Sequence, residues 1–458
     1  MTPTPTPTTS PKGEVAAKQP VGASATASHA FCFSTSSASY SPPESALHNP
    51  KSKICYVLPT RDRPEPLART IAALAALPPH DAQVIVVDNA SRTPPRLPIE
   101  LSNGLSVTLL MRDANEGAAA RNAGVLASDT TCEWIVMLDD DSRPMHAGLL
   151  DALRDAPADV GAVQAEILLP GSTGILPVGS RHGQDGRATG LRHESGGLPE
   201  VFIGCGVAIR RRAFLDIGGY DPTFNYYAEE YDLAAKLMLG GWRITIDRRF
   251  QVLHEKAQAG RDMDLILRRL VRNNAWVMRR YAPRAERHAE IRRTIFRYGR
   301  IALKERAELG YAAGLADLAR TWFRQPRREM PETIWERFTG KAAARAAISA
   351  AHAAKPFATA AIIDTGKNDH IIREVLAELG VRIIRDEAAA EALVIGTLSP
   401  GPMLDALAPC AGTPDAGRVI APLDLGATDL QGGATSSPLA ASRKCVRGNA
   451  APSAALTA

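Results

Sequence analysis

Short apolar runs alternate with segments of helical spacing along the first third of the sequence. The apolar runs have strand length and end in polar turns, and the segments between them repeat their apolar residues every three or four positions. We therefore expect strands at residues 54–58, 83–87, 105–111 and 134–138, and helices at 66–77 and 118–127. Pro59 has no backbone N–H for a sheet and is expected to end the first strand. The alternation predicts an α/β fold, with a mostly parallel sheet flanked by helices.

This pattern is interrupted at residues 171–197, which are rich in glycine and arginine and show little apolar periodicity. We interpret them as an insertion or loop, and a tolerated surface insertion is favoured over a lid. Glycines within the next apolar run, at 201–209, indicate that another group approaches that backbone closely. Further strands are expected at 201–209, 243–247 and 250–253, the last closed by His254, and a helix opens at Ala228.

The rest of the chain predicts a helical segment followed by a second, smaller α/β pattern. Residues 263–323 have helical spacing, with a break near Pro283. From residue 360, strands are expected at 361–363, 381–384 and 392–395, and a helix at 369–379. The predicted organisation is a disordered Thr/Pro/Ser-rich tail at 1–50, a larger α/β domain at 51–260, a basic helical extension at 261–355, a small α/β module at 356–425 and a disordered tail at 426–458.

Polar residues stand at the carboxyl ends of three expected strands: Thr60 and Arg61, then Asp88, then Asp139, Asp140 and Asp141. In a parallel sheet these ends meet in one crevice, where ligands bind. Adjacent carboxylates beside a buried strand are costly unless they are neutralised, and Mg²⁺ or Mn²⁺ carrying a diphosphate is a natural neutraliser. A solvated acidic turn is the alternative, which the convergence of the three strand ends disfavours.

Composition and charge narrow the class of protein only modestly. With 458 residues, 45% hydrophobic and 22% charged, the chain can hold two ordered domains and tails. The net charge of +5 is mild, but Lys and Arg gather at 261–306, a belt suited to anionic lipid, a phosphorylated acceptor or nucleic acid. A solvated helical face is the simpler interpretation of that belt.

Six cysteines without a C-x-x-C pair predict buried thiols in a reducing compartment. No apolar run reaches the length of a membrane span, and the N-terminus lacks the order of a secretory signal. We therefore expect a cytoplasmic protein.

The polar strand ends belong to a longer series of motifs: VLPTRDR at 57–63, VVDNAS at 86–91, NEG at 115–117, ARNAG at 120–124, LDDD at 138–141, GGYD at 218–221, EEYDL at 229–233 and then His254. In this order and spacing they resemble the catalytic domain of glycosyltransferase family 2, the inverting GT-A enzymes, and particularly its rhamnosyltransferase-like and galactofuranosyltransferase-like members. The resemblance covers residues 54–255. It does not cover the tails or the segment after residue 360.

The resemblance implies a metal site and a nucleotide site. Mn²⁺ or Mg²⁺ would be held by Asp139, Asp141 and His254, although a histidine after a strand is often an ordinary core or surface residue. The nucleotide-binding residues would be Pro59, Thr60, Arg61, Asp88, Arg121, Asp139 and Asp140, with Asp88 on the nucleobase. Arg61 is equally well explained as a surface residue paired with Asp62.

The resemblance also implies a catalytic base at the start of the helix that opens at Ala228. Family members usually carry Glu-Asp there, whereas this chain has Glu229 and Glu230. Glu230 takes the base position, one methylene longer than the usual Asp, and Glu229 is the reserve candidate. Alternatively, both glutamates only favour the helix N-terminus electrostatically, a role that Asp232 already fills.

The expected activity is metal-dependent, inverting transfer of a hexosyl or deoxyhexosyl group from a nucleotide-diphosphate donor. The acceptor would be a glycan, lipid-linked or polysaccharide hydroxyl, in the synthesis of cell-envelope polysaccharide. If the acceptor is lipid-linked, the basic belt would hold the enzyme peripherally at the anionic inner face of the plasma membrane.

Other classes are less well supported. A degenerate, non-catalytic GT-A-like carbohydrate-binding or scaffold protein is suggested by the Glu230 exchange, but it would not need the retained acidic cluster. A nucleotidyltransferase or a Rossmann dehydrogenase would need a glycine-rich phosphate loop after a strand, and none is present. No nucleic-acid recognition motif or aromatic platform accompanies the basic belt, so nucleic acid is not an expected partner.

Overall fold

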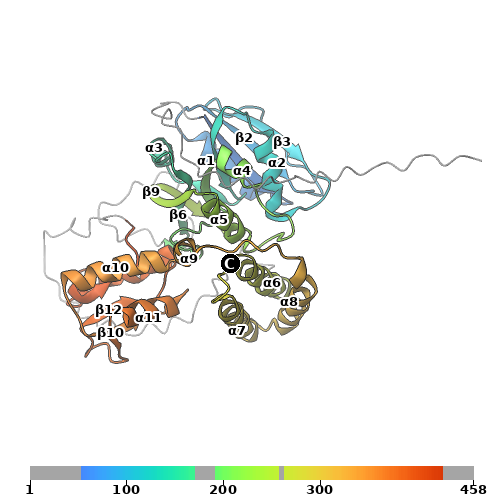
Figure 1. The fold of residues 1–458 in the computed structure, drawn as a ribbon. Helices are drawn as coiled ribbons and strands as arrows, with labels where there is room; N and C mark the ends of the chain where they lie inside the picture. The colour runs from blue at the N-terminus through green and yellow to red at the C-terminus, as the bar shows by residue number, and fades with distance from the viewer. Residues whose placement is uncertain (1–52, 171–190, 257–261, 426–458) are drawn as a thin grey trace, which may run out of the picture. The chain divides into compact units, whose positions relative to one another are not determined.

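The computed structural model describes residues 53–170, 191–256 and 262–425. The predicted disordered tails at 1–50 and 426–458 lie outside the described residues, as does most of the predicted insertion at 171–197. The described elements form two sheets and a group of helices between them in sequence (Figure 1).

The larger sheet has the strand order β3-β2-β1-β4-β8-β6-β9-β5, with β7 paired to β6. Strands β1 to β4 are parallel to one another, and β6 is parallel to β9, whereas β8 runs antiparallel to β4 and β6. The strands are β1 (Lys53–Thr60), β2 (Ala82–Asp88), β3 (Ser106–Met111), β4 (Cys132–Leu138), β5 (Ser142–Pro144), β6 (Val160–Leu169), β7 (Arg192–His193), β8 (Gly206–Arg210) and β9 (Arg243–His254).

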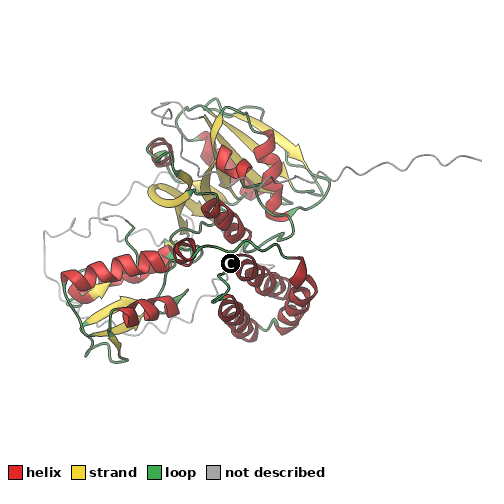
Figure 2. Ribbon diagram, in the orientation of Figure 1, coloured by secondary structure: helices red, strands yellow, loops and turns green. Residues whose placement is uncertain are grey.

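Helices cover both faces of this sheet (Figure 2), because alternate strand residues are apolar on both sides. On one face, Tyr56 of β1 belongs to the core formed with α1 and α3; on the other, Val57 belongs to the core formed with α2, α4 and α5. The helices are η1 (Gly117–Ala119), α1 (Pro64–Ala75), α2 (Ala120–Ala127), α3 (Gly148–Arg154), α4 (Arg211–Asp216) and α5 (Glu229–Leu239).

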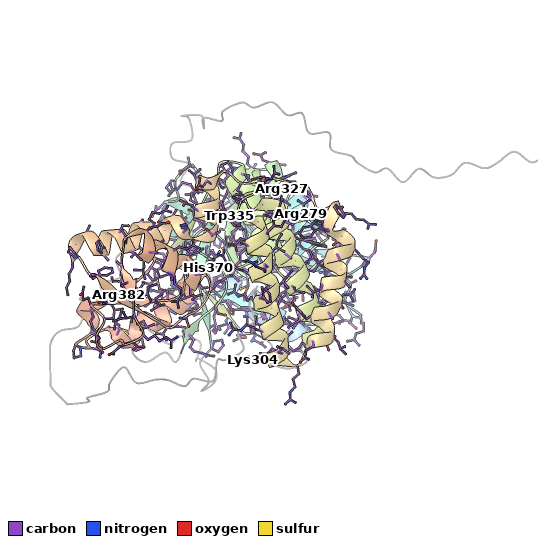
Figure 3. The ribbon with its side chains drawn as sticks, turned by 60° about the horizontal axis from the view of Figure 1, so that its bottom comes forward. Arg279, Lys304, Arg327, Trp335, His370 and Arg382 are labelled. Carbon is purple, nitrogen blue, oxygen red and sulfur yellow. The ribbon has the colours of Figure 1, made fainter. Side chains whose placement is uncertain are left out.

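A helical segment follows the larger sheet. It comprises α6 (Met263–Tyr281), α7 (Arg287–Glu305), α8 (Glu308–Thr321), η2 (Trp322–Arg324), α9 (Glu332–Thr339) and α10 (Lys341–Ala354). The break predicted near Pro283 falls between α6 and α7. Arg327 donates to the carbonyl of Arg279 at 3.1 Å, and Figure 3 labels both residues. Among the described helices, none combines the length and apolarity that a bilayer crossing requires.

The smaller sheet is entirely parallel and has the order β11-β10-β12-β13. Its elements are β10 (Thr359–Ile363), α11 (Asp369–Glu378), β11 (Arg382–Ile383), β12 (Ala392–Ile395), α12 (Pro400–Leu407), η3 (Ala408–Cys410), η4 (Ala416–Arg418) and β13 (Val419–Ile420). Helix α11 lies beside α7, where Arg293 is 3.8 Å from Glu374 and His370 is 4.0 Å from Glu290 (Figure 3). The fold class expected from the sequence, including the helical extension and the small C-terminal α/β segment, is therefore confirmed.

Several expected element boundaries were wrong. Strand β1 continues through Pro59 to Thr60, because beyond Val57 it pairs only with β2, so the missing N–H removes no bond to β4. The two strands expected at 243–247 and 250–253 are one strand, β9, whose register with β6 shifts after Asp247 and absorbs the polar interruption.

The remaining differences concern the middle of the larger sheet. The strand expected at 201–209 begins only at Gly206, and Val201 instead forms a bridge to Leu198. Strand β6, buried along most of its length in the sheet, was not anticipated. The four cysteines within the described residues are buried, as expected: Cys55, Cys132, Cys205 and Cys410.

Candidate active site

The acidic turn after β4 is balanced by an arginine that the sequence did not single out. Arg63 lies 2.7 Å from Asp140 and 2.6 Å from Asp141, through its two terminal nitrogens. Thr60 donates to the second oxygen of Asp140 at 2.9 Å. Burial still raises the pKa of Asp140 to about 7, because removing a carboxylate from water costs more than these contacts return. Asp140 and Asp141 are thus buried carboxylates with defined partners.

The first carboxylate of the turn has a different partner. Asp139 contacts the guanidinium of Arg121, which is buried at the start of α2. Burial opposes the charge of Arg121, but Asp139 and its other acidic neighbours hold the pKa of Arg121 above its usual value. The Nε of Arg121 has no hydrogen-bond partner among the described residues. Arg121 therefore has a buried N–H donor, at Nε, that is available to a ligand beside Asp139.

His254 closes the other side of the acidic turn. Its Nε2 lies 3.4 Å from Asp141, and its Nδ1 lies 3.3 Å from Glu194 and 3.4 Å from the Cys205 sulfur. Burial opposes the charged ring, but these three neighbours hold the pKa of His254 well above its usual value. Lys256 pairs with Glu194 at 2.7 Å, so the acidic group behind the histidine is also neutralised.

These groups include a set of potential metal ligands. Within the part of the chain that the structure describes, one carboxylate oxygen of Asp139, the Cys205 sulfur and one ring nitrogen of His254 lie within 4.8 Å of one another. Oxygen, nitrogen and sulfur donors so close together suit a divalent cation. The structure brings Asp139 and Asp141 each close to His254, but Cys205 replaces Asp141 in the compact set. The predicted ligand set of Asp139, Asp141 and His254 stays a prediction.

The turn before α5 sets the orientation of the two candidate bases, Glu229 and Glu230, which are the first residues of that helix. Tyr227 and Ala228 have positive φ angles of 73° and 64°, an uncommon backbone for these residue types. Asn273 of α6 stabilises this turn, because its amide donates to the carbonyls of Phe224, Tyr226 and Tyr227 at 3.0, 2.9 and 2.8 Å. The helical extension therefore positions the start of α5.

Glu229 and Glu230 follow that turn and differ in environment. Glu229 is 6% exposed, and its Oε2 has no hydrogen-bond partner within the described chain. Burial, and next the neighbouring charge of Glu230, raise the pKa of Glu229 well above its usual value. Burial also raises the pKa of Glu230, but backbone N–H groups, including that of Gly204, and Arg121 counteract it. Glu230 is therefore the more readily ionised of the pair.

Gly204 makes room for Glu230, as the glycines of this segment predicted. A Cβ on Gly204 would lie 2.9 Å from the Oε1 of Glu230. Glu230 lines a cavity of about 250 Å³ together with Asp139, Cys205, Tyr231 and His254. The candidate base and the candidate metal ligands thus share one cavity.

The predicted nucleotide residues lie at the carboxyl ends of β1 and β2. Asp88 is fully buried and accepts from the Ser91 N–H at 3.1 Å, while its second oxygen has no hydrogen-bond partner among the described residues. Pro59 and Thr60 end the neighbouring strand, in register with Val87 and Asp88. Arg61 instead points to the surface, 4.0 Å from Asp62, as the alternative interpretation expected.

Three residues at the site were missed. Arg63 stood inside a quoted motif, and its buried partners were not visible in the sequence. Cys205 looked like an ordinary strand residue. Glu194 falls in the stretch 171–197 that we interpreted as a surface insertion; this is wrong for its described end, since Glu194 is 2% exposed and contacts His254. No local pattern marked Glu194, because its partners follow some sixty residues later.

Comparisons with known proteins find similarity over the domain that carries this site. Residues 55–218 match the family model of glycosyl transferase family 2. An N-acetylglucosaminyl-diphospho-decaprenol L-rhamnosyltransferase of Mycobacterium tuberculosis, found in strains CDC 1551 and H37Rv, is 28% identical over 227 residues, which cover 43% of this chain and 74% of that protein.

Two solved structures are more distantly similar to this protein. One is the mannosyltransferase PcManGT from Pyrobaculum calidifontis in complex with GDP-Man and Mn²⁺, with 18% identity, a TM-score of 0.39, and 69% of this chain and 85% of that chain covered. The other is GalNAc-T7 with UDP, GalNAc and Mn²⁺, with 16% identity, a TM-score of 0.40, and 59% and 57% covered.

The sheet with its acidic turn, and the family match over residues 55–218, are those expected of a nucleotide-sugar transferase of the GT-A class. Over this region the chain is similar to family 2 glycosyltransferases, and it is distantly similar to the mycobacterial rhamnosyltransferase.

Proposed function

We propose that this enzyme is a metal-dependent, inverting glycosyltransferase that uses a glycan, lipid-linked or polysaccharide hydroxyl as acceptor. The observation that carries the proposal is the shared cavity: Glu230 lines it together with Asp139 and His254, two members of the group of potential metal ligands. A base and potential metal ligands in one cavity suit a direct displacement.

The donor nucleotide is assigned to the ends of β1 and β2. The unpartnered, buried oxygen of Asp88 suits a nucleobase N–H, since a buried acceptor without a partner is costly. Thr60, which is in register with Asp88, donates to Asp140 at 2.9 Å and so connects this strand end to the acidic turn. Arg121 suits the base or a phosphate through its unused Nε, and Pro59 contributes the strand end. Arg61 contributes least, since it lies at the surface.

A divalent cation, Mn²⁺ or Mg²⁺, would be held by Asp139, Asp141 and His254. When bound, it supplies positive charge that stabilises the departing diphosphate. Arg63 contributes to the same end of the site, because its guanidinium already neutralises Asp140 and Asp141.

Glu230 acts as the general base, and Glu229 remains the protonated neighbour. As the acceptor oxygen bonds to the anomeric carbon, its proton passes to the Glu230 carboxylate. The bond between that carbon and the diphosphate oxygen breaks, and its electron pair leaves with the nucleoside diphosphate. One displacement inverts the anomeric centre and forms no covalent sugar–enzyme intermediate.

The mycobacterial relative suggests the chemistry of donor and acceptor. That protein is a rhamnosyltransferase acting on a diphospho-decaprenol glycolipid, according to its name. We therefore favour L-rhamnose, a deoxyhexose, as the first donor sugar to test and a lipid-linked glycan as the first acceptor, in the synthesis of envelope polysaccharide at the cytoplasmic side.

A lipid-linked acceptor fits the surface of α7. Phe296 and Leu303 are 66% and 68% exposed on this helix, next to Arg300 and Lys304 (Figure 3 labels Lys304). Exposed apolar side chains among cations suit the interface of an anionic bilayer. Sedimentation with phosphatidylglycerol vesicles should fall in high salt and in the double variant Phe296→Ser/Leu303→Ser; no binding, or binding indifferent to both, would refute the contact.

The test of the donor site is a thermal-shift and calorimetric screen with UDP, GDP, dTDP and CDP, each with and without Mn²⁺. Wild type, Asp141→Ala and the exposed control Asp216→Ala would be compared. We expect one nucleotide to bind in a metal-dependent manner to wild type and control but not to Asp141→Ala. Equal nucleotide binding by all three proteins would show that Asp141 is not part of the donor site. No nucleotide binding by any of them would refute the proposed donor site.

A further inference from the structure

A lysine of the C-terminal module reaches the helix that carries the candidate bases. Lys367 lies in the loop between β10 and α11, and its ammonium group donates to the hydroxyl of Tyr231. The same nitrogen lies 4.5 Å from the centroid of the Tyr231 ring. Tyr231 directly follows Glu230 on α5, and both line the cavity of the site. Residues distant in sequence thus meet beside the cavity.

The loop that carries Lys367 is held firmly. The Leu398 N–H donates to the Lys367 carbonyl at 3.0 Å, and the side chain of the next residue, Asn368, donates to the Thr339 carbonyl at 3.1 Å. The Gly366 N–H donates to the Gly396 carbonyl at 2.7 Å. The backbone on both sides of Lys367 is therefore fixed before any substrate arrives.

This loop stands where a small parallel sheet would ordinarily bind a ligand. The chain order of the sheet reverses between β10 and β12, and ligands of such sheets bind at the carboxyl ends next to that reversal. Here the transferase domain occupies this edge: Ser399 donates to the Gly196 carbonyl at 2.7 Å, and Asp405 lies 2.6 Å from His193. The module therefore uses its ligand-binding edge as a docking edge.

We propose that the C-terminal module is part of the transferase site and that Lys367 is a positioning residue for Glu230. The inference rests on the proposed function, because it takes Glu230 as the general base. Lys367 places a positive charge beside α5 that favours the ionised form of Glu230, and its contact with Tyr231 fixes the first turn of that helix.

The charged groups around Glu230 define what Lys367 has to offset. Burial and Asp139 after β4 disfavour its carboxylate, whereas Arg121 of α2 and the Gly204 N–H favour it, and Glu229 on the same helix is the protonated neighbour. Burial lowers the pKa of Lys367 to about 7, and the negative charge of Glu230 limits that fall. Lys367 therefore carries its charge below about pH 7 and loses it above, which links its support of Glu230 to neutral and acidic conditions.

The first experiment needs no substrate. The side-chain pKa of Lys367 would be measured by NMR of ¹⁵N-lysine-labelled full-length protein, with the signal assigned from Lys367→Met. We expect Glu230→Gln to lower the Lys367 pKa by about 1 unit, because it removes the nearby negative charge. Glu229→Gln should leave it nearly unchanged, since Glu229 is already protonated. An unchanged Lys367 pKa in both variants would overturn the inference.

The second experiment separates positioning from mere stability. Release of nucleoside diphosphate from UDP-glucose, GDP-mannose and dTDP-L-rhamnose would be followed against pH for wild type, Lys367→Met and the exposed control Lys355→Met. For the donor that is turned over, we expect the kcat of Lys367→Met to be about 10- to 100-fold lower than that of wild type. The acid limb of its pH–rate profile should move to higher pH, because the pKa of Glu230 rises when the nearby positive charge is lost. The affinity for the nucleotide should not change. Lys355→Met should match wild type.

The outcomes distinguish this inference from the proposed function. If Glu230→Gln abolishes turnover but Lys367→Met keeps the wild-type rate and pH profile, the positioning role is wrong and the base assignment stands. If Glu230→Gln retains turnover, the base assignment itself fails. A Lys367→Met protein that loses rate, nucleotide affinity and melting temperature together would show a structural role only and would also refute the inference.

Discussion

Asp141 and His254 face each other at 3.4 Å because a short strand joins their backbones. Strand β5 begins at Ser142, which pairs with His254, and the Glu255 N–H donates to the Asp141 carbonyl at 2.8 Å. The acidic turn after β4 is thereby attached to the last strand of the domain. The geometry of the candidate metal site depends on this pairing more than on any local motif.

Removing His254 should weaken metal-dependent nucleotide binding. We expect His254→Ala to reduce the apparent Mn²⁺ affinity about 10- to 100-fold, since one ring-nitrogen ligand is lost from a site with other donors. Titration of Mn²⁺ in the presence of the selected nucleotide would measure it by calorimetry. His288→Ala, at an exposed position on α7, is the matched control and should not change the affinity. Unaltered Mn²⁺ affinity in His254→Ala would exclude this residue as a ligand.

Adding a methyl group beside the candidate base should impair turnover selectively. The Cβ of Gly204→Ala would lie 2.9 Å from the Oε1 of Glu230, so the carboxylate must move. We expect kcat to fall about 100-fold, since small displacements of a catalytic group are costly, with little change in nucleotide affinity. Gly417→Ala, where a Cβ meets nothing within 4 Å, should retain full activity. Full turnover by Gly204→Ala would contradict the position assigned to Glu230.

The docking of the C-terminal module should depend on pH through His193. Burial opposes its charge, but Asp405 and Glu166 raise the pKa of His193 to about 9. Because the folded state holds this proton more tightly, the stabilisation is fully present below about pH 6.5 and is lost as pH rises through 9.

Melting temperatures of wild type and Asp405→Asn, measured from pH 5.5 to 10, would test this link. The difference in melting temperature between the two proteins should correspond to about 1–3 kcal/mol of unfolding free energy at low pH, and it should shrink towards zero above pH 9. Asp415→Asn, whose partner is Arg418 and not a histidine, is a suitable control and should show no such trend. A gap that stays constant with pH would argue against His193 as the titrating group.

Breaking the buried ion pair between α5 and α6 should destabilise the protein strongly. Arg280 lies 2.7 Å from Asp232 and 2.8 Å from Asp221, and Tyr281 donates to Asp232 at 2.7 Å. We expect Arg280→Met to lower the free energy of unfolding by about 3–5 kcal/mol, because it leaves buried carboxylates without their cation.

The control for that prediction is an exposed pair of the same domain. Arg212 lies 3.6 Å from Asp216, with both side chains more than half exposed. Arg212→Met should change the free energy of unfolding by less than about 0.5 kcal/mol in urea denaturation. Similar losses in both variants would mean that the Arg280 network is no more important than a surface pair.

Asp232 shows where reasoning from sequence position was insufficient. It was interpreted as a charge that favours the helix N-terminus, yet it is fully buried and paired with Arg280, a residue of another helix. Helix α5 and its acidic start were predicted correctly, because helical spacing and the glycines that follow are local signals. The partner of Asp232 was not predictable, because tertiary contacts leave no periodic mark on the sequence.

The sequence by itself determined the alternation of strands and helices, the acidic turn from Asp139 to Asp141 and the resemblance of these motifs to glycosyltransferase family 2. These features follow from short-range patterns of apolar residues and from polar strand ends that a parallel sheet must bring together. Only the tertiary structure decided that Arg63 neutralises the turn, that Glu194 and Cys205 flank His254, and that Lys367 reaches Tyr231. Such contacts depend on how whole elements pack, since buried charges must find partners wherever the fold brings them.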